Sequence, residues 1–193
     1  MTEPTIDRRE LLAQLFENPD DYLFVSGLAG AAKDTAALTE DGDNLYTMAG
    51  TMGAAVPMGL GVALNAPDRS VVVVTGDGEL LMGIGSLVTV ASMAPANLSI
   101  VCIDNGQHGE TGGQTGHTAL NTDLEAIAKG SGLPSTMTIT DPAQINDGVA
   151  FLATAPGPRF LLTRVLPSAP SVYKRNMDPA ACRHRFRNAF LEV

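Results

Sequence analysis

The chain has 193 residues, which is enough for one compact domain with its own core and too few for two ordinary domains. Its 21 acidic and 12 basic residues give a formal net charge of -9, which disfavours nucleic acids and anionic membrane surfaces as partners. No apolar run approaches the roughly 20 residues of a membrane span, and the N-terminus lacks a continuous apolar signal segment. Only Cys102 and Cys182 are present, so we expect a single cytoplasmic domain over residues 1–193.

Short β-branched runs alternate with longer amphipathic stretches, a pattern typical of a parallel sheet with helices on both faces. In chain order we expect a helix over Ile6–Phe16, a strand over Tyr22–Leu28, a helix over Met52–Asn65, a strand over Ser70–Thr75, a helix over Leu80–Met93, a strand over Leu98–Asp104, a helix over Leu124–Lys129, a strand over Ser135–Thr140, a helix over Pro142–Ala153 and a strand over Arg159–Val165. The sequence therefore predicts a doubly wound α/β fold.

A last helix is expected to follow, with Asp178 as its cap and Pro179 as its first residue. Cys182, Phe186 and Phe190 would then share one face. We interpret the basic residues from Lys174 to Arg187 as the solvated side of this helix, with a partner contact as the alternative.

Glycine is concentrated in one part of the chain, where thirteen of the twenty glycines lie between Gly50 and Gly116. Within it, Gly76-Asp77-Gly78 follows one buried strand and Asp104-Asn105-Gly106 follows the next. The carboxyl ends of neighbouring parallel strands form the ligand-binding edge of an open α/β sheet. Carboxylate and amide oxygens there suit magnesium or calcium holding a diphosphate, and the following helix N-terminus offers N–H groups.

A Gly-Asp-Gly sequence alone is also an ordinary turn. Paired with Asp104-Asn105 one helix and one strand later, it resembles the thiamine diphosphate fingerprint, which closes with an asparagine pair and here keeps the second asparagine. A dinucleotide-binding interpretation is disfavoured because no GxGxxG sequence opens a helix in this chain.

On these residues the chain resembles the pyrophosphate-binding half of thiamine diphosphate enzymes. It is most similar to the β subunits or C-terminal halves of sulfopyruvate and phosphonopyruvate decarboxylases. The segments NLYTMAGTMGAAVPMGLGVAL and DNGQHGETGGQTGHT carry this resemblance, and VSGLAGAAKDT adds a weaker match with Lys33 and Asp34 at the family's Arg and Glu positions. His108 and Gly116 depart from the family pattern, which leaves the substrate more open than the cofactor.

The resemblance implies thiamine diphosphate and magnesium as cofactors. The implied metal ligands are Asp77, Asn105 and the main-chain carbonyl of Gln107. Met52 would hold the two cofactor rings in a bent conformation while the Gly50 carbonyl faces the pyrimidine amine. The other implied cofactor contacts are the main chains of Gly76, Gly78 and Glu79, together with Gly109 and Thr111.

The loop after Asn105 carries the candidate catalytic groups. His108 is our candidate for proton transfer or for orienting the substrate carboxylate, and His117 is the alternative for proton transfer, because histidine is the usual proton-transfer side chain near neutral pH. Gln114, with Thr111, could bind a substrate carboxylate. We interpret Glu110 as a solvated charge.

The catalytic glutamate of this family lies on a separate pyrimidine-binding domain, and no glutamate here has that sequence context. The resemblance therefore implies a pyrimidine-binding α subunit that supplies it, in an α2β2 or larger assembly, and covers an apolar surface around residues 50–61 and 109–116. The expected reaction is decarboxylation of a small 2-oxo acid. Lys33 is the one basic residue available for an anionic substrate tail.

Three alternatives stay open at this point. A carboligase of the acyloin or acetolactate type differs only in the fate of the intermediate. A 2-oxo acid:ferredoxin oxidoreductase β subunit would need cysteines for an iron–sulfur cluster, which two cysteines do not provide. The third alternative is a cofactor-binding subunit without chemistry of its own.

Overall fold

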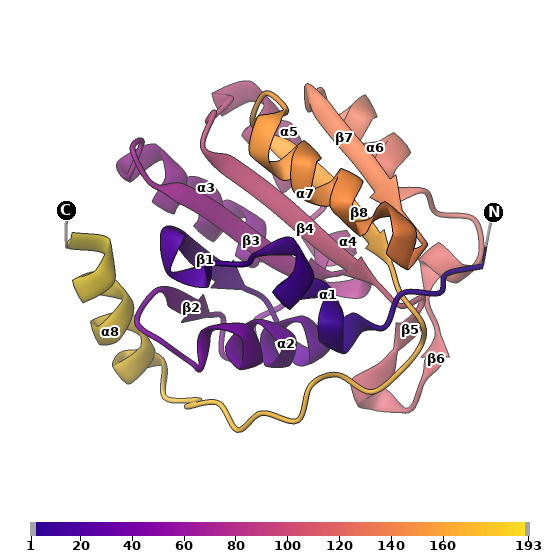
Figure 1. The fold of residues 1–193 in the computed structure, drawn as a ribbon, viewed down its shortest axis with the longest axis horizontal. Coiled ribbons are helices and arrows are strands. Elements are labelled where there is room, and N and C mark those ends of the chain that lie inside the picture. Colours follow the sequence, from indigo (N-terminus) through magenta and orange to yellow (C-terminus); the bar gives the residue numbers. More distant parts are fainter. Residues whose placement is uncertain (1–2, 192–193) are drawn as a thin grey trace.

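A six-stranded parallel sheet forms the centre of the computed structural model, which describes residues 3–191 (Figure 1). Across the sheet, the strands are β2 (Leu45–Thr47), β1 (Tyr22–Ser26), β3 (Ser70–Gly76), β4 (Leu98–Asp104), β8 (Arg159–Arg164) and β7 (Ser135–Ile139). All five neighbouring pairs are parallel. The central strands β3 and β4 are rich in β-branched residues and buried on both faces, as their apolar runs predict.

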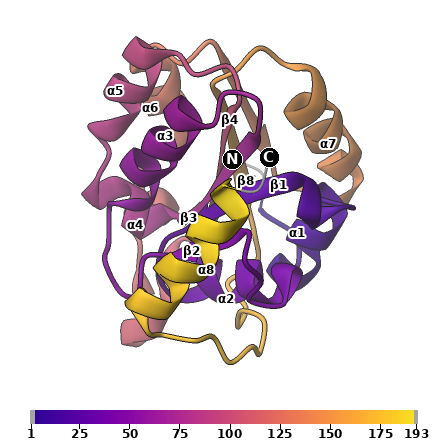
Figure 2. The same ribbon diagram turned by 90° about the vertical axis from the view of Figure 1, so that its left-hand side faces the viewer.

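Helices cover both faces of this sheet, as Figure 2 shows from the side. One face carries α3 (Ala55–Asn65), α4 (Asp77–Met82), α5 (Ser86–Met93) and α6 (Leu124–Gly130), and the other carries α1 (Arg8–Leu15), α2 (Ala29–Thr39) and α7 (Ile145–Thr154). Each face has its own apolar core, so the predicted doubly wound α/β fold is confirmed. Within residues 3–191, no helix combines the length and hydropathy needed to cross a membrane.

Helix α2 and strand β2 were absent from the sequence prediction. Helix α2 buries mainly small side chains, Ala31, Ala32 and Ala36 among them, so its apolar stripe is weak. Strand β2 has only three residues and lies at the edge of the sheet, where short strands give little alternating pattern.

The prediction of one continuous helix over Leu80–Met93 is wrong. It is divided into α4 and α5 by Gly83, Ile84 and Gly85. Gly83 allows a close main-chain contact, because a Cβ atom there would lie 2.1 Å from the Gly53 carbonyl oxygen. This contact joins the end of α4 to the loop before α3.

The predicted helix over Met52–Asn65 begins too early, since α3 starts at Ala55. Gly50 and Gly53 have φ values of +100° and +76°, which a helix does not permit. Met52 therefore lies in a loop, whereas the sequence pattern placed it on a helix.

The C-terminal helix α8 (Pro179–Leu191) packs beside β2, although the two elements are far apart in the sequence (Figures 1 and 2). Its predicted cap is confirmed, because the Ala180 N–H donates to Asp178 Oδ1 at 2.9 Å. Cys182 and Phe186 are buried and Phe190 packs against the same core.

The interpretation of the basic tail as one solvated helix face is wrong in part. Lys174 and Arg175 precede the helix, in an irregular segment between β8 and α8. Arg185 forms an ion pair with Asp41 at 3.3 Å.

Candidate functional site

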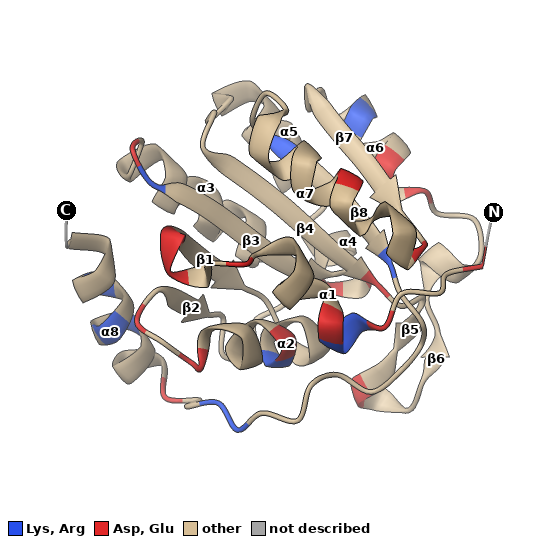
Figure 3. Cartoon of the chain, in the orientation of Figure 1, with Lys and Arg blue, Asp and Glu red and all other residues tan. Residues whose placement is uncertain are grey.

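The register of β3 and β4 brings two acidic residues together at the carboxyl edge of the sheet. Gly76 pairs with Ile103, so Asp77 and Asp104 follow at neighbouring positions. Both are buried, with 4% and 3% of their surface exposed. The Thr118 hydroxyl lies 3.2 Å from Asp77 Oδ2 and 2.6 Å from Asp104 Oδ1 and connects the two carboxylates. Figure 3 marks the acidic end of β4 near α4.

The charge of Asp77 is poorly compensated in this position. Burial raises the pKa of Asp77 to about 6, the negative charge of Asp104 adds to this, and hydrogen bonds from Gly78 and Thr118 oppose it. A bound divalent cation would relieve both the burial penalty and the repulsion between the carboxylates. The environment of Asp77 therefore fits a metal ligand.

Asn105 and Gln107 lie beside this pair, where the sequence predicts the other ligands. The Asn105 Oδ1 atom accepts a hydrogen bond from the Gln107 main-chain N–H at 3.1 Å, and both residues are half-buried. Among residues 3–191, no three His, Cys, Asp or Glu side chains gather as a metal site. A metal here would depend on one carboxylate together with amide, main-chain and diphosphate oxygens, a set that suits magnesium.

The first turn of α4 supplies main-chain N–H groups at the same edge. Helix α4 begins at Asp77, so the N–H groups of Gly78 and Glu79 belong to its first turn, where no helical carbonyl accepts from them; the Gly78 N–H donates to the Asp77 carboxylate. The Glu79 carboxylate is directed elsewhere: it lies against Gly27 and accepts from the Thr75 hydroxyl at 2.7 Å. Burial raises the pKa of this carboxyl. The Glu79 side chain is thus engaged away from this edge, and the contact of its main chain with a diphosphate stays a prediction.

His108 lies against the start of α4. A Cβ atom on Gly78 would be 3.1 Å from the His108 Cε1 atom, so the absence of a side chain at Gly78 leaves room for the imidazole. His117 is its neighbour, with ring centroids 6.4 Å apart. The structure therefore brings His108 next to the predicted diphosphate-binding turn.

Met52 and Gly50 lie in the loop that follows β2, at the same carboxyl edge. The Met48 N–H donates to the Ser26 carbonyl at 3.0 Å and ties the loop to the end of β1. Ala49 and Gly50 both have positive φ, and 37% of the Met52 surface is exposed. Met52 is thus accessible from the side on which the strands end.

The loop after Asn105 forms a small hairpin of β5 (Gln107–His108) and β6 (Gln114–Thr115), with Gly109 and Thr111 in the turn between them. Thr111 Oγ1 donates to Gln114 Oε1 at 2.9 Å, and Gln114 Nε2 donates to the Thr111 carbonyl at 2.7 Å. These polar groups, predicted to bind substrate, satisfy each other across the exposed turn. Substrate would have to replace these bonds.

The ion pair between Lys33 and Glu110 concerns two predictions. Lys33 Nζ lies 2.7 Å from Glu110 Oε1, which links α2 to the hairpin turn. Glu110 is exposed, as expected for a solvated charge, and is also paired with Lys33. Lys33 has an acidic partner and is not a free cation for a substrate tail.

The sequence prediction missed several polar contacts of this region, including the partners of Asp34, the residue at the family's Glu position. Asp34 forms a buried ion pair with Arg8 at 2.7 Å and accepts from the Ser171 N–H at 2.7 Å. Thr118 and Arg164 contact Asp104. The position of Arg164 at the end of β8, the strand next to β4, is a signal that could have revealed it.

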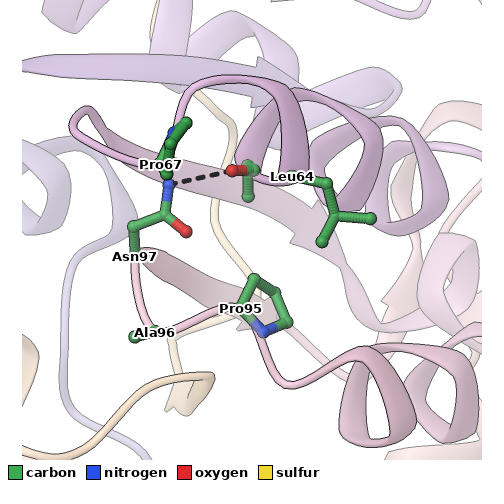
Figure 4. Close-up of a pocket in the computed structure, with 6 residues that line it drawn as sticks. Leu64, Pro67, Pro95, Ala96 and Asn97 are labelled. Atoms are coloured by element: carbon green, nitrogen blue, oxygen red, sulfur yellow. Dashed lines mark hydrogen bonds between the residues drawn. The ribbon is translucent and has the colours of Figure 1, made fainter.

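The predicted apolar surface is present in part. Met52 is exposed in the first stretch and Met82 is 68% exposed nearby, whereas residues 109–115 expose glycine and polar side chains. An apolar hollow also lies between α3 and the loop before β4, at the amino ends of the strands and away from the predicted site (Figure 4). Its lining includes Leu64, Pro67 and Pro95.

Comparison with known proteins agrees with this geometry. Residues 32–162 match the family described as thiamine pyrophosphate enzyme, C-terminal TPP binding domain; thiamine pyrophosphate is another name for thiamine diphosphate. Sulfopyruvate decarboxylase subunit beta of Methanocaldococcus jannaschii is 32% identical, over 94% of this chain and 96% of its own length.

Two further relatives differ from this chain in length. Phosphonopyruvate decarboxylase of Streptomyces viridochromogenes is 38% identical, over 92% of this chain but only 43% of its own length. A solved structure described as a thiamin diphosphate-dependent enzyme from Mycobacterium smegmatis has a TM-score of 0.67 and 23% identity. It covers 86% of this chain and 32% of its own, and shows that the fold is shared. The chain therefore belongs to the thiamine pyrophosphate enzymes, through their C-terminal TPP-binding domain, in the group that contains the sulfopyruvate and phosphonopyruvate decarboxylases.

Proposed function

We propose that this chain is the β subunit of a two-subunit thiamine diphosphate-dependent decarboxylase that acts on a small 2-oxo acid resembling sulfopyruvate or phosphonopyruvate. The observation that carries the proposal is the buried Asp77 beside Asp104, at the ends of neighbouring strands in the Gly-Asp-Gly and Asp-Asn-Gly contexts. The sulfopyruvate decarboxylase subunit named above supports it, because the match extends over nearly the whole of both chains.

Magnesium and the cofactor diphosphate would be held by the groups at this edge. Asp77, Asn105 and the Gln107 carbonyl provide oxygen ligands for the ion. The N–H groups of Gly78 and Glu79 provide donors for the diphosphate, where the start of α4 favours negative charge. The whole chain, residues 1–193, would act as the pyrophosphate-binding domain.

When bound, thiamine diphosphate supplies the carbon nucleophile and the electron sink that allow carbon dioxide to leave a 2-oxo acid. The protein residues position the reactants and handle protons. We propose that Met52 supports the cofactor rings, that the Gly50 carbonyl accepts from the pyrimidine amine, and that His108 transfers a proton. Gln114 and Thr111 would exchange their mutual hydrogen bonds for bonds to the substrate carboxylate, with Gly76 and Gly109 allowing close approach of the cofactor.

A second subunit is part of this proposal. Several relatives of this length are named β subunits, and phosphonopyruvate decarboxylase is more than twice as long as the part that matches. The partner would be a pyrimidine-binding α subunit that supplies the catalytic glutamate and covers Met52 and the exposed hairpin, in an α2β2 or larger assembly. Because Lys33 is paired with Glu110, most groups that bind an anionic substrate tail would come from this partner. The complex would be cytoplasmic, in keeping with two free, buried cysteines.

Reconstitution tests this function. The chain is mixed with its partner polypeptide, sought first in the neighbouring reading frame, and supplied with thiamine diphosphate, magnesium and a panel of 2-oxo acids. Release of carbon dioxide and aldehyde, dependent on both chains, is the expected result. Consumption of pyruvate and a second carbonyl compound without aldehyde would instead indicate a carboligase. If none of the acids yields carbon dioxide or a ligated product, the catalytic proposal is overturned.

The oxidoreductase alternative receives no support from the cysteines. Cys102 is fully buried in β4 and Cys182 is buried in α8, on separate elements. The 2-oxoglutarate synthase subunit KorB of Methanocaldococcus jannaschii is 30% identical, but over only 74% of this chain and 50% of its own length. We expect no ferredoxin reduction by the reconstituted complex.

A further inference from the structure

A buried polar network contacts Asp77 through the Thr118 hydroxyl. It consists of Thr118, Asp104 and Arg164, which we call the Asp104 network. Thr118 and Asp104 are 2% and 3% exposed, and the Arg164 side chain is 16% exposed. These residues come from β4, from the turn after the hairpin and from the end of β8, so the tertiary structure alone brings them together.

Within this network Asp104 is the carboxylate with compensating partners. It accepts from the Gly106 N–H at 3.0 Å and from the Thr118 hydroxyl at 2.6 Å, and the Arg164 guanidinium lies 3.6 Å away. Arg164 also donates to the Thr118 main-chain carbonyl at 3.3 Å and so fixes the turn that carries the hydroxyl. Asp104 thus has a cation and two hydrogen-bond donors within the protein.

Asp77 meets the same network through one atom. Its Oδ2 atom accepts from the Thr118 hydroxyl at 3.2 Å, and the single hydrogen of this hydroxyl is shared with Asp104 Oδ1 at 2.6 Å. Gly116 packs against the same oxygen atom, because a Cβ atom there would lie 3.2 Å from Asp77 Oδ2. The network therefore holds Oδ2 on the inner side of the site and limits rotation of the carboxylate.

We propose that the Asp104 network positions Asp77 for metal binding, with Thr118 as the residue that makes the connection. This inference rests on the proposed function, since it assigns to Asp77 a magnesium ion. Groups that hydrogen-bond to metal ligands fix their orientation, and losing one typically costs about 10- to 100-fold in metal affinity. Thr118, Asp104 and Arg164 are thus positioning residues and need no contact with substrate.

The test measures the magnesium concentration that half-saturates thiamine diphosphate binding to the full chain with its partner, by calorimetry, beside a thermal melt without metal. Thr118→Val should raise this concentration by about tenfold or more, while Thr118→Ser, which keeps the hydroxyl, should stay within about threefold of the original. Thr163→Val is the matched control, because Thr163 is a fully buried threonine that donates to the Cys102 carbonyl at 2.9 Å. It should lower the melting temperature to a similar degree without changing the magnesium requirement.

The outcomes separate this inference from the proposed function. If the unmodified protein binds no thiamine diphosphate with magnesium, the proposed function fails. If it binds, but Thr118→Val stays within twofold of it or Thr163→Val weakens metal binding equally, the positioning role is overturned. Should Thr118→Val not fold, Thr118→Ala removes the same hydroxyl without adding apolar bulk, and the same criteria apply.

Discussion

Replacing Asp77 with asparagine should stabilise the metal-free protein at neutral pH while abolishing its magnesium-dependent binding of cofactor. Burial, together with the charge of Asp104, raises the pKa of Asp77 from 3.8 to about 6. Since one pKa unit corresponds to about 1.4 kcal/mol, the ionised carboxylate destabilises the folded chain by about 3 kcal/mol at neutral pH. Asparagine carries no charge but makes weaker hydrogen bonds, so the expected gain in unfolding free energy is about 1–3 kcal/mol.

The sign of the pH dependence follows from the raised pKa. The unfolded chain loses this proton near pH 3.8 and the folded chain near pH 6. Between these values, a rising pH favours the unfolded state, and above the folded pKa the loss is constant. Asp77→Asn does not titrate, so its advantage should be small at about pH 4 and complete above about pH 7.

Urea unfolding in a chelator, at about pH 4 and about pH 7.5, measures this difference. Asp68→Asn is the control, because Asp68 is exposed and its substitution should change stability by no more than about 0.5 kcal/mol. Magnesium with thiamine diphosphate should stabilise the original chain and leave Asp77→Asn unchanged. The reasoning is refuted if Asp77→Asn is no more stable than the original at neutral pH, or if its advantage is the same at both pH values.

His108→Phe should lower turnover of the reconstituted enzyme by about 100-fold or more, with cofactor affinity within a few-fold, because a positioned proton-transfer group is lost. His184→Phe, on the exposed side of α8, is the control, and equal activities of the two variants would show that His108 is structural. Gly83→Ala should lower the unfolding free energy by about 1–3 kcal/mol, since its Cβ would lie 2.1 Å from the Gly53 carbonyl oxygen. Gly85→Ala, where the Cβ meets open space, should be neutral, and similar urea midpoints for the two alanine variants would contradict the crowding argument.

The strongly patterned elements were predictable because local composition decides them. The runs within β3 and β4 are short, almost wholly apolar, rich in valine and isoleucine, and followed by Gly76 and Asn105, a pattern that predicts buried strands. Asp178 and Pro179 marked the start of α8 through cap chemistry that acts within one turn. Helix α2 and strand β2 were missed because small buried alanines and a three-residue edge strand carry little periodic signal.

The predicted site shows a similar division. Asp77 and Asn105 could be placed from the sequence because each directly follows a buried strand, and neighbouring parallel strands end at one edge. The partners of Lys33 and Asp34 could not be predicted from the sequence, since Glu110 and Arg8 are distant from them along the chain. Pairing between distant charged residues depends on how helices pack, which local sequence does not encode.

The doubly wound α/β class, the location of Asp77 and Asn105 at strand ends, and the family could all be predicted from the sequence. Each follows from a short-range pattern or a contiguous motif. The tertiary structure decided the close packing of Gly53 against Gly83, the position of His108 against Gly78, and the joining of Asp77 to Asp104 through Thr118. These contacts connect residues on different strands and loops, so they exist only once the sheet register and the hairpin fold have fixed the distances between them.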